Sequence, residues 1–213
     1  MNTVGPIARV IARDPVPPAL RRFIWDIQSM VELAESEREI LLIGRDLMAR
    51  LVTADDWLPA VFAAASPGVG RQFQIFRDGL ERFSVVSTVL GGGASVTISQ
   101  PAIWEIAGVL HGAVLRQQFD GSSSTCAQAG GSRLLKAHTI EPRSSGSGDV
   151  VKCRNAIDDQ ISIVVHVYGG DIARMTRRSN PGRGGMNAPS TGYANPESDP
   201  PYDIFSIQAD IRD

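Results

Sequence analysis

The pattern of apolar residues changes once along this chain, near residue 68, from a helical period to a period of two. Before that point apolar residues recur at every third or fourth position, which is typical of amphipathic helices. After it, apolar and polar residues alternate in short runs separated by clusters of Gly, Ser, Asn or Asp. Such runs are typical of the short strands of a barrel or sandwich. The chain therefore predicts a mainly β fold behind an N-terminal helical segment.

Three helices are expected in the first segment. The first runs from Pro18 to about Val31 with an apolar stripe on one face. The second begins after Ser36, which forms a capping box with Glu39, and is expected to end near Arg50. A third, shorter helix is expected over residues 57–62, before a Ser-Pro-Gly turn.

A chain of 213 residues is long enough to bury one sizeable core, so a single domain over 1–213 is expected. Its parts are N-terminal helices at 1–67, a β-barrel at 68–172 and a C-terminal extension at 173–213. The expected strands are 73–75, 83–85, 103–110, 113–119, 133–137, 150–154 and 161–168.

Composition favours some function classes over others. The formal net charge is -2, and the arginines between residues 174 and 183 lack interleaved aromatic residues, so nucleic acid is not an expected partner. No apolar run has the length of a membrane span, and a cytoplasmic location is expected. The two cysteines, Cys126 and Cys153, are too few for a disulfide framework and are expected to be free thiols. The expected partner is a small-molecule ligand or substrate, and the sequence leaves the oligomeric state open.

Two segments carry regularly spaced residues: Gly93, Ser99, Pro101, Glu105 and Gly112 in the first, and Gly148, Val151 and Asn155 in the second. Their spacing resembles that of the two cupin motifs. Segment 93–112 has the spacing of the first motif, in which a glycine, two histidines around one residue, a glutamate and a second glycine occur in order. Segment 148–155 has the spacing of the second motif, in which a histidine stands between a glycine and an asparagine.

Four further segments resemble the bacterial cysteine dioxygenase and 3-mercaptopropionate dioxygenase group. They are residues 81–86, 108–110, 166–170 and 191–195, and the likeness runs from about Leu20 to Phe205. The resemblance implies a cupin fold, a double-stranded β-helix or jelly-roll barrel.

In that family three histidines hold ferrous iron, and the resemblance places Ser99, Pro101 and Val151 at their positions. A hydroxyl, a proline ring and an alkyl group cannot replace three imidazoles. The prediction is therefore that the inherited iron site is lost and that no cofactor is bound. Gln72 falls on the family's position for the substrate carboxylate, which is often a glutamine in the bacterial relatives.

The predicted catalytic residues are Glu105, His166 and Tyr168. His166 and Tyr168 match a histidine and a tyrosine near the family's metal, and as residues i and i+2 of one strand they share a face. Glu105 is expected to lie on a facing strand, with a pKa raised by burial, and to trade protons with His166 in a pocket open at one barrel mouth. The alternatives are a structural hydrogen bond for Glu105 and a satisfied core histidine for His166.

The predicted substrate-binding residues are Gln72, Ser99 and Cys153. For Cys153, a small buried hydrophobic role is the alternative. His111 and His138 stand at strand ends and are expected to be rim residues.

Three functions are consistent with these residues. The first is an acid–base enzyme, an isomerase, cyclase, lyase or dehydratase, that acts on a small polar organic molecule without iron. The second is an inactive cupin that serves as a ligand-binding or interaction subunit. The third is a thiol dioxygenase for cysteine or 3-mercaptopropionate that uses a different metal site.

Overall fold

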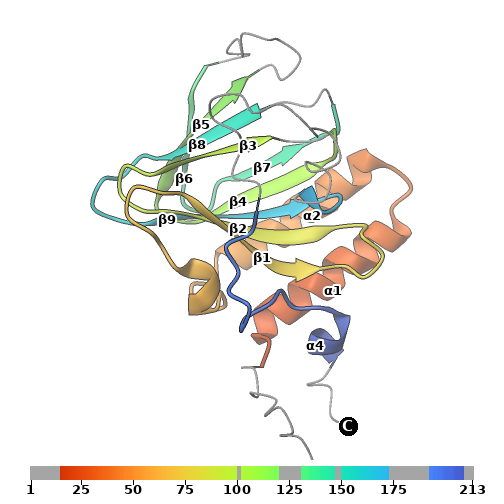
Figure 1. Cartoon of the computed structure of the whole chain (residues 1–213). Coiled ribbons are helices and arrows are strands. Elements are labelled where there is room, and N and C mark those ends of the chain that lie inside the picture. Colours follow the sequence, from red (N-terminus) through yellow and green to blue (C-terminus); the bar gives the residue numbers. More distant parts are fainter. Residues whose placement is uncertain (1–14, 100–101, 120–130, 147–149, 173–191, 209–213) are drawn as a thin grey trace, which may run out of the picture.

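The computed structural model describes residues 15–99, 102–119, 131–146, 150–172 and 192–208 (Figure 1). Several residues of the sequence predictions lie outside the described residues: Pro101, Cys126, Gly148 and the arginines between 174 and 183. Of Ser99 only the backbone is described.

Two of the three expected helices are confirmed. Helix α1 spans Pro18–Leu33 and helix α2 spans Glu37–Val52. The hydroxyl of Ser36 accepts a hydrogen bond from the Glu39 backbone N–H, as the capping box predicts. The third helix is shorter than expected: only a 3-10 turn, η1, forms at Ala60–Ala63. Pro59 explains the difference, because a proline disfavours the helical conformation of the residue before it.

The strands form two antiparallel sheets, so the expected mainly β fold with N-terminal helices is confirmed. The five-stranded sheet has the order β1 (Arg71–Arg77), β2 (Ser84–Leu90), β9 (Ser162–Tyr168), β4 (Glu105–His111) and β7 (Ile140–Arg143). The four-stranded sheet has the order β3 (Ser95–Ser99), β8 (Val150–Asn155), β5 (Ala113–Phe119) and β6 (Arg133–Lys136). A short helix, α4, spans Ile204–Gln208.

Two of these strands, β3 and β7, were not expected from the sequence. Strand β7 contains Pro142, and a proline usually argues against a strand. The structure accommodates it because β7 lies at the edge of its sheet. In strand β3 polar residues alternate with β-branched apolar residues, a pattern that predicts a strand. The pattern was therefore present in the sequence, close after the three glycines that precede the strand.

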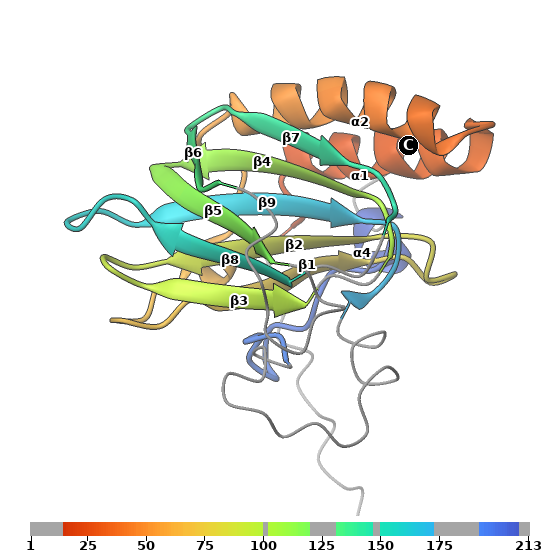
Figure 2. The same ribbon diagram turned by 90° about the horizontal axis from the view of Figure 1, so that it is seen from above.

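The five-stranded sheet has apolar residues on both faces and separates two cores. On its outer face Val165 and Val167 pack in one cluster with residues of α1 and α2, among them Ile24 and Met48. On its inner face Val164 belongs to a second cluster, between the two sheets. Figure 2 shows both helices along one side of this sheet and the four-stranded sheet on the other. The alternation of strand residues therefore sends every second side chain into the barrel.

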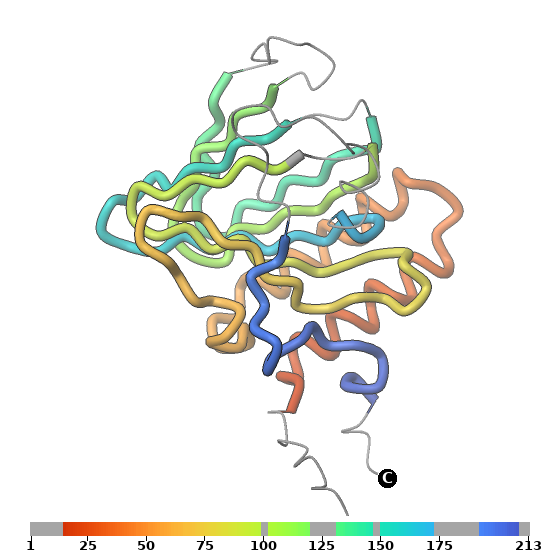
Figure 3. Tube along the Cα trace, viewed as in Figure 1, coloured from red at the N-terminus to blue at the C-terminus, as the bar shows by residue number. Residues whose placement is uncertain are grey.

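The C-terminal segment completes the outer edge of β1. The backbone N–H of Ala194 donates to the carbonyl of Gln72, and that of Tyr202 donates to the carbonyl of Ile75. Asn195 adds side-chain hydrogen bonds to the backbone of Gln74. Figure 3 shows this segment, in blue, running beside β1.

Residues of two kinds at the motif positions, an asparagine and two glycines, have structural roles. The Asn155 amide nitrogen lies within 3.0 Å of the carbonyls of Leu90 and Gly91, and its oxygen accepts from Ser162. Gly93 and Gly112 have φ values of 68° and 72°, in the left-handed region that glycine favours. These residues stabilise the connections between strands, and this role does not depend on any ligand.

Gly112→Ala is expected to destabilise the protein more than Gly93→Ala. At both positions alanine would have to adopt the left-handed backbone conformation, which costs about 1–2 kcal/mol. A Cβ at Gly112 would also lie 2.3 Å from the Ser162 hydroxyl and 2.8 Å from the Ile161 carbonyl, whereas a Cβ at Gly93 meets nothing within 4 Å. We expect a further loss of about 1–3 kcal/mol at Gly112, measured by urea unfolding. Equal losses would contradict the packing argument.

Candidate functional site

Glu105 and His166 meet inside the barrel. Glu105 is the first residue of β4, and its neighbour β9 carries His166 on the inner face. The Oε1 atom of Glu105 lies 2.8 Å from Nδ1 of His166, and both residues are buried. The structure thus joins directly the two residues that were expected to form a pair.

A polar chain continues from His166 toward β1. Its Nε2 atom lies 3.1 Å from the Thr88 hydroxyl, and the Gln72 amide donates to the same hydroxyl over 3.2 Å. A carboxylate only accepts hydrogen bonds, so Nδ1 of His166 carries the proton; in the neutral ring Nε2 then accepts from Thr88. All four side chains, from Gln72 through Thr88 and His166 to Glu105, are buried.

Two arginines hold the other oxygen of Glu105. Nη2 of Arg116 lies 2.8 Å from Oε2, and Nε of Arg143 lies 3.3 Å from it. Burial by itself raises the pKa of Glu105, but the charge of Arg116, the hydrogen bond from His166 and the charge of Arg143 outweigh it and hold that pKa well below its usual range. The expected raised pKa is therefore wrong: Glu105 is a buried carboxylate.

Neither arginine was found from the sequence. Arg116 follows Val114 by two residues on β5, and both are buried, so the alternation that placed Val114 inside also placed Arg116 there. An arginine at an inward position requires a buried acid, and Glu105 is that acid. Arg143 stands in β7, the strand that the sequence analysis missed.

Tyr168 lies against His166, and its hydroxyl is buried. The two rings stack with their centroids 5.4 Å apart. Within the described residues the buried Tyr168 hydroxyl has no hydrogen-bond partner. Burial, and then the charge of Glu105, raise the pKa of this phenol well above its usual value. The barrel interior therefore holds a neutral hydroxyl with one donor to offer, which is a signal of a ligand or water position.

The other predicted residues are less well placed for chemistry. Cys153 is buried opposite Arg116 and Val96, and burial raises the pKa of its thiol to about 11. A neutral, buried thiol lines the barrel interior and does not act as a nucleophile. His111 is half-buried at the end of β4, and His138 is exposed in a turn, so both are outside the polar chain.

Two of the positions that the family resemblance assigns to iron ligands, Ser99 and Val151, lie on the four-stranded sheet. Val151 is buried in the inner core and pairs with Ile98 of β3. Ser99 ends β3 opposite Val150, and Pro101 lies outside the described residues. Among the residues that the structure describes, no group of three or more His, Cys, Asp or Glu side chains is arranged to hold a metal ion.

A cleft of about 360 Å³ opens where the edge strands β6 and β7 of the two sheets meet. Arg116 and Arg143 line this cleft and also bind Glu105, so they link it to the buried pair. Glu141 of β7 accepts hydrogen bonds from Arg116 with one oxygen and from Arg133 of β6 with the other.

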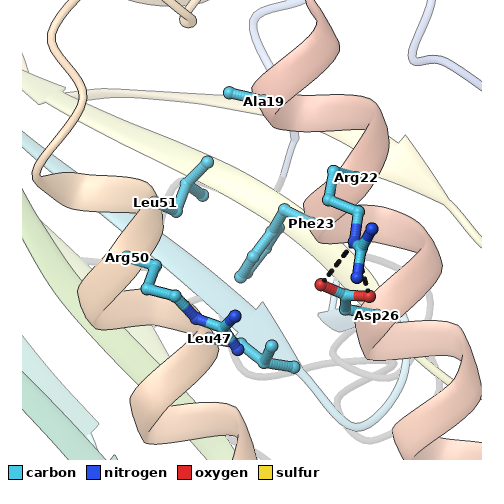
Figure 4. Close-up of a pocket in the computed structure, with 7 residues that line it drawn as sticks. All are labelled: Ala19, Arg22, Phe23, Asp26, Leu47, Arg50 and Leu51. Atoms are coloured by element: carbon cyan, nitrogen blue, oxygen red, sulfur yellow. Dashed lines mark hydrogen bonds and ion pairs between the residues drawn. The ribbon is translucent and has the colours of Figure 1, made fainter.

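A second hollow, of about 270 Å³, lies between α1 and α2 (Figure 4). It is lined mainly by aliphatic and aromatic carbon, with Phe23, Leu47 and Leu51 as its larger apolar residues. Arg22 and Asp26 form an ion pair with each other over 3.0 Å at its rim. The helices that line this hollow pack on the outer face of the five-stranded sheet, whereas the barrel site lies on the inner face. In the described part of the chain, no helix combines the length and apolar character needed to cross a membrane.

Comparison with solved structures finds similar barrels at low sequence identity. An uncharacterised conserved protein with a double-stranded β-helix domain from Klebsiella pneumoniae is 17% identical over 56% of this chain and 93% of its own, with a TM-score of 0.43. The TT1209 protein from Thermus thermophilus is 14% identical over 55% of this chain and 98% of its own, with a TM-score of 0.41.

An oxalate oxidase structure is 16% identical over 50% of this chain, with a TM-score of 0.39. The matched region covers 53% of the oxalate oxidase chain, about half its length. No known protein family's sequence profile matches this chain. The likeness concerns the fold alone.

Glu105→Gln is expected to flatten the pH dependence of stability. The native pKa of Glu105 lies below the unfolded value near 4.5, so its stabilising effect is full above that pH and is lost as the pH falls. The slope of unfolding free energy against pH, measured between about pH 4.5 and 3, should lose up to about 1.4 kcal/mol per pH unit.

The same variant should lose about 3–5 kcal/mol at pH 7, because Arg116 is left buried without this carboxylate. Glu35→Gln, on an exposed residue, is the matched control and should change neither quantity. An unchanged slope in Glu105→Gln would show that this carboxylate is not held ionised by its neighbours.

Proposed function

We propose that this cupin barrel catalyses proton transfer on a small polar organic molecule without iron, with Glu105, His166 and Tyr168 at the reacting centre. The observation that carries the proposal is the buried 2.8 Å hydrogen bond from His166 to Glu105, beside the buried Tyr168 hydroxyl, which has no partner in the part of the chain that the structure describes. Isomerisation, cyclisation, elimination and dehydration all need these two kinds of group, a base and a hydroxyl donor.

His166 is the proposed base. Its Nδ1 proton is directed at Glu105, and its Nε2 lone pair accepts from Thr88, whose hydroxyl has to give way to the substrate's proton. When Nε2 takes a proton from the substrate, the Glu105 carboxylate stabilises the resulting imidazolium. Glu105 is thus a positioning residue that holds the tautomer and the charge, rather than a proton donor.

Tyr168 is the proposed donor to the substrate oxygen on which negative charge develops. A neutral phenol in a site shielded from water stabilises such charge more strongly than the same group in water. Gln72, Ser99 and Cys153 complete the proposed binding surface. Gln72 fixes Thr88 by a hydrogen bond, and Cys153 contributes an apolar wall.

The hydrogen bonds that His166 and Glu105 already make support an iron-free site. His166 uses one ring nitrogen for Glu105 and the other for Thr88, and Glu105 uses its second oxygen for two arginines. Ferrous iron in a barrel of this kind needs several neutral imidazoles or carboxylates with open lone pairs. These residues do not fit ferrous iron.

Protein expressed in iron-supplemented medium should contain well under one equivalent of iron per chain. The physical reason is the replacement of three nitrogen ligands by Ser99, Pro101 and Val151. The triple variant Ser99→His, Pro101→His and Val151→His is the matched control and should gain iron in elemental analysis. A stoichiometric, chelator-resistant metal in the original protein would refute the iron-free site.

Proton transfer can be measured before the reaction is known. In D₂O, a panel of 2-oxo and 2-hydroxy acids is incubated with the protein, and proton NMR follows the loss of signals next to the carbonyl or carboxyl group. We expect exchange of at least one acid, with His166→Gln and Tyr168→Phe at least about 100-fold slower. His138→Gln, on an exposed residue outside the polar chain, should exchange at the original rate.

Tyr168→Phe also separates function from stability. The substitution removes a buried hydroxyl without a partner in the described residues, so the free energy of unfolding should stay equal or rise by about 1 kcal/mol. A variant that is more stable but inactive identifies a hydroxyl kept for its chemistry. A loss of stability above about 1 kcal/mol would show that the hydroxyl is bonded in the native protein.

A ligand-binding cupin without catalysis is the second candidate. It is favoured by one observation: both ring nitrogens of His166 are satisfied inside the protein, as in a structural histidine. It predicts no exchange above the His166→Gln level for any acid of the panel. Thiol oxidation, the third function, predicts iron-dependent oxygen uptake with cysteine or 3-mercaptopropionate; we expect uptake equal to a buffer control.

A further inference from the structure

We propose that the cleft between β6 and β7 binds a small organic carboxylate. Its lining contains three guanidinium groups, from Arg116, Arg133 and Arg143, and among the described lining residues a single carboxylate, Glu141. Its volume of about 360 Å³ falls within the range of small-molecule sites. This binding site does not depend on the proton transfer proposed for the barrel interior.

The inner wall of the cleft is built before any ligand arrives. Arg116 is nine-tenths buried and is held at both ends, by Glu105 through Nη2 and by Glu141 through Nη1. A guanidinium fixed in this way loses little conformational entropy on binding. Its Nη1 group, which already binds the Glu141 carboxylate, shows that this guanidinium can donate to a carboxylate from the cleft side.

Glu141 shows how a carboxylate sits in the cleft. Its two oxygens accept from two different arginines, Arg116 on the inner side and Arg133 on the outer side. The Arg133 side chain is 68% exposed, and exposed ion pairs contribute little stability. Arg133 can therefore leave Glu141 for a ligand at low cost, and the ligand's carboxylate then meets the same guanidinium geometry that Glu141 uses.

The geometry implies competition between Glu141 and the ligand. The carboxylate of Glu141 and that of the ligand both bind Arg133 and the side of Arg116 that faces the cleft. Removal of the Glu141 charge should therefore strengthen ligand binding. Because Arg116 also holds Glu105, occupation of the cleft changes the charge balance next to His166. The side-chain NMR signals of the His166 ring report that change without any turnover.

Isothermal titration with malonate, succinate and inorganic phosphate, at constant ionic strength, tests the site. We expect a carboxylate to bind with a stoichiometry of one, Arg133→Gln to weaken it at least about 10-fold, and Glu141→Gln to tighten it several-fold. Arg22→Gln, which removes the exposed arginine of the other hollow, is the matched control and should bind as the original protein does.

Three results would overturn the proposal. They are no saturable binding of either dicarboxylate to the original protein or to Glu141→Gln, equal affinity for phosphate and the dicarboxylates, and unchanged affinity in Arg133→Gln. Arg133 is largely exposed, so its variant should fold even if Glu141→Gln does not. Failure here leaves the deuterium-exchange test unaffected, because that readout depends on His166 and Tyr168.

Discussion

The removal of one carboxylate, that of Glu105, from water is the constraint on which the interior of this barrel depends. An isolated ion there would cost several kcal/mol, about the whole stability of many domains. The structure offsets that cost with charge-assisted hydrogen bonds from Arg116, Arg143 and His166. Each partner is then fixed in turn: His166 in one tautomer, and Arg116 between two acids. The polar arrangement from Gln72 to Arg133 follows from this single buried charge.

The fold was more predictable than the site, because period and turn chemistry report on local structure. The helices at Pro18–Leu33 and Glu37–Val52 follow from their apolar stripes and from the capping residue Ser36. Strand β7 was not predicted because Pro142 is acceptable only in a strand at the edge of a sheet. Which strand lies at the edge depends on the arrangement of the whole sheet.

In the site, the juxtaposition of Glu105 and His166 was anticipated through the family resemblance, since no spacing rule connects residues 61 positions apart. The sign of the Glu105 pKa shift was missed. Burial and charge act in opposite directions on a carboxyl, and the sequence suggested the burial without the arginines that reverse its effect. The alternation of β5 carried that information, because Val114 and Arg116 share the inner face.

The pairing of the C-terminal segment with β1 also bears on how the chain folds during synthesis. Residues Ala194 and Tyr202 are made after every strand from β1 to β9, yet they provide the hydrogen bonds along the free side of β1. Until they leave the ribosome, that side presents unpaired N–H and C=O groups to other nascent chains. This segment, made after all of these strands, therefore covers the open edge of the first strand of the sheet.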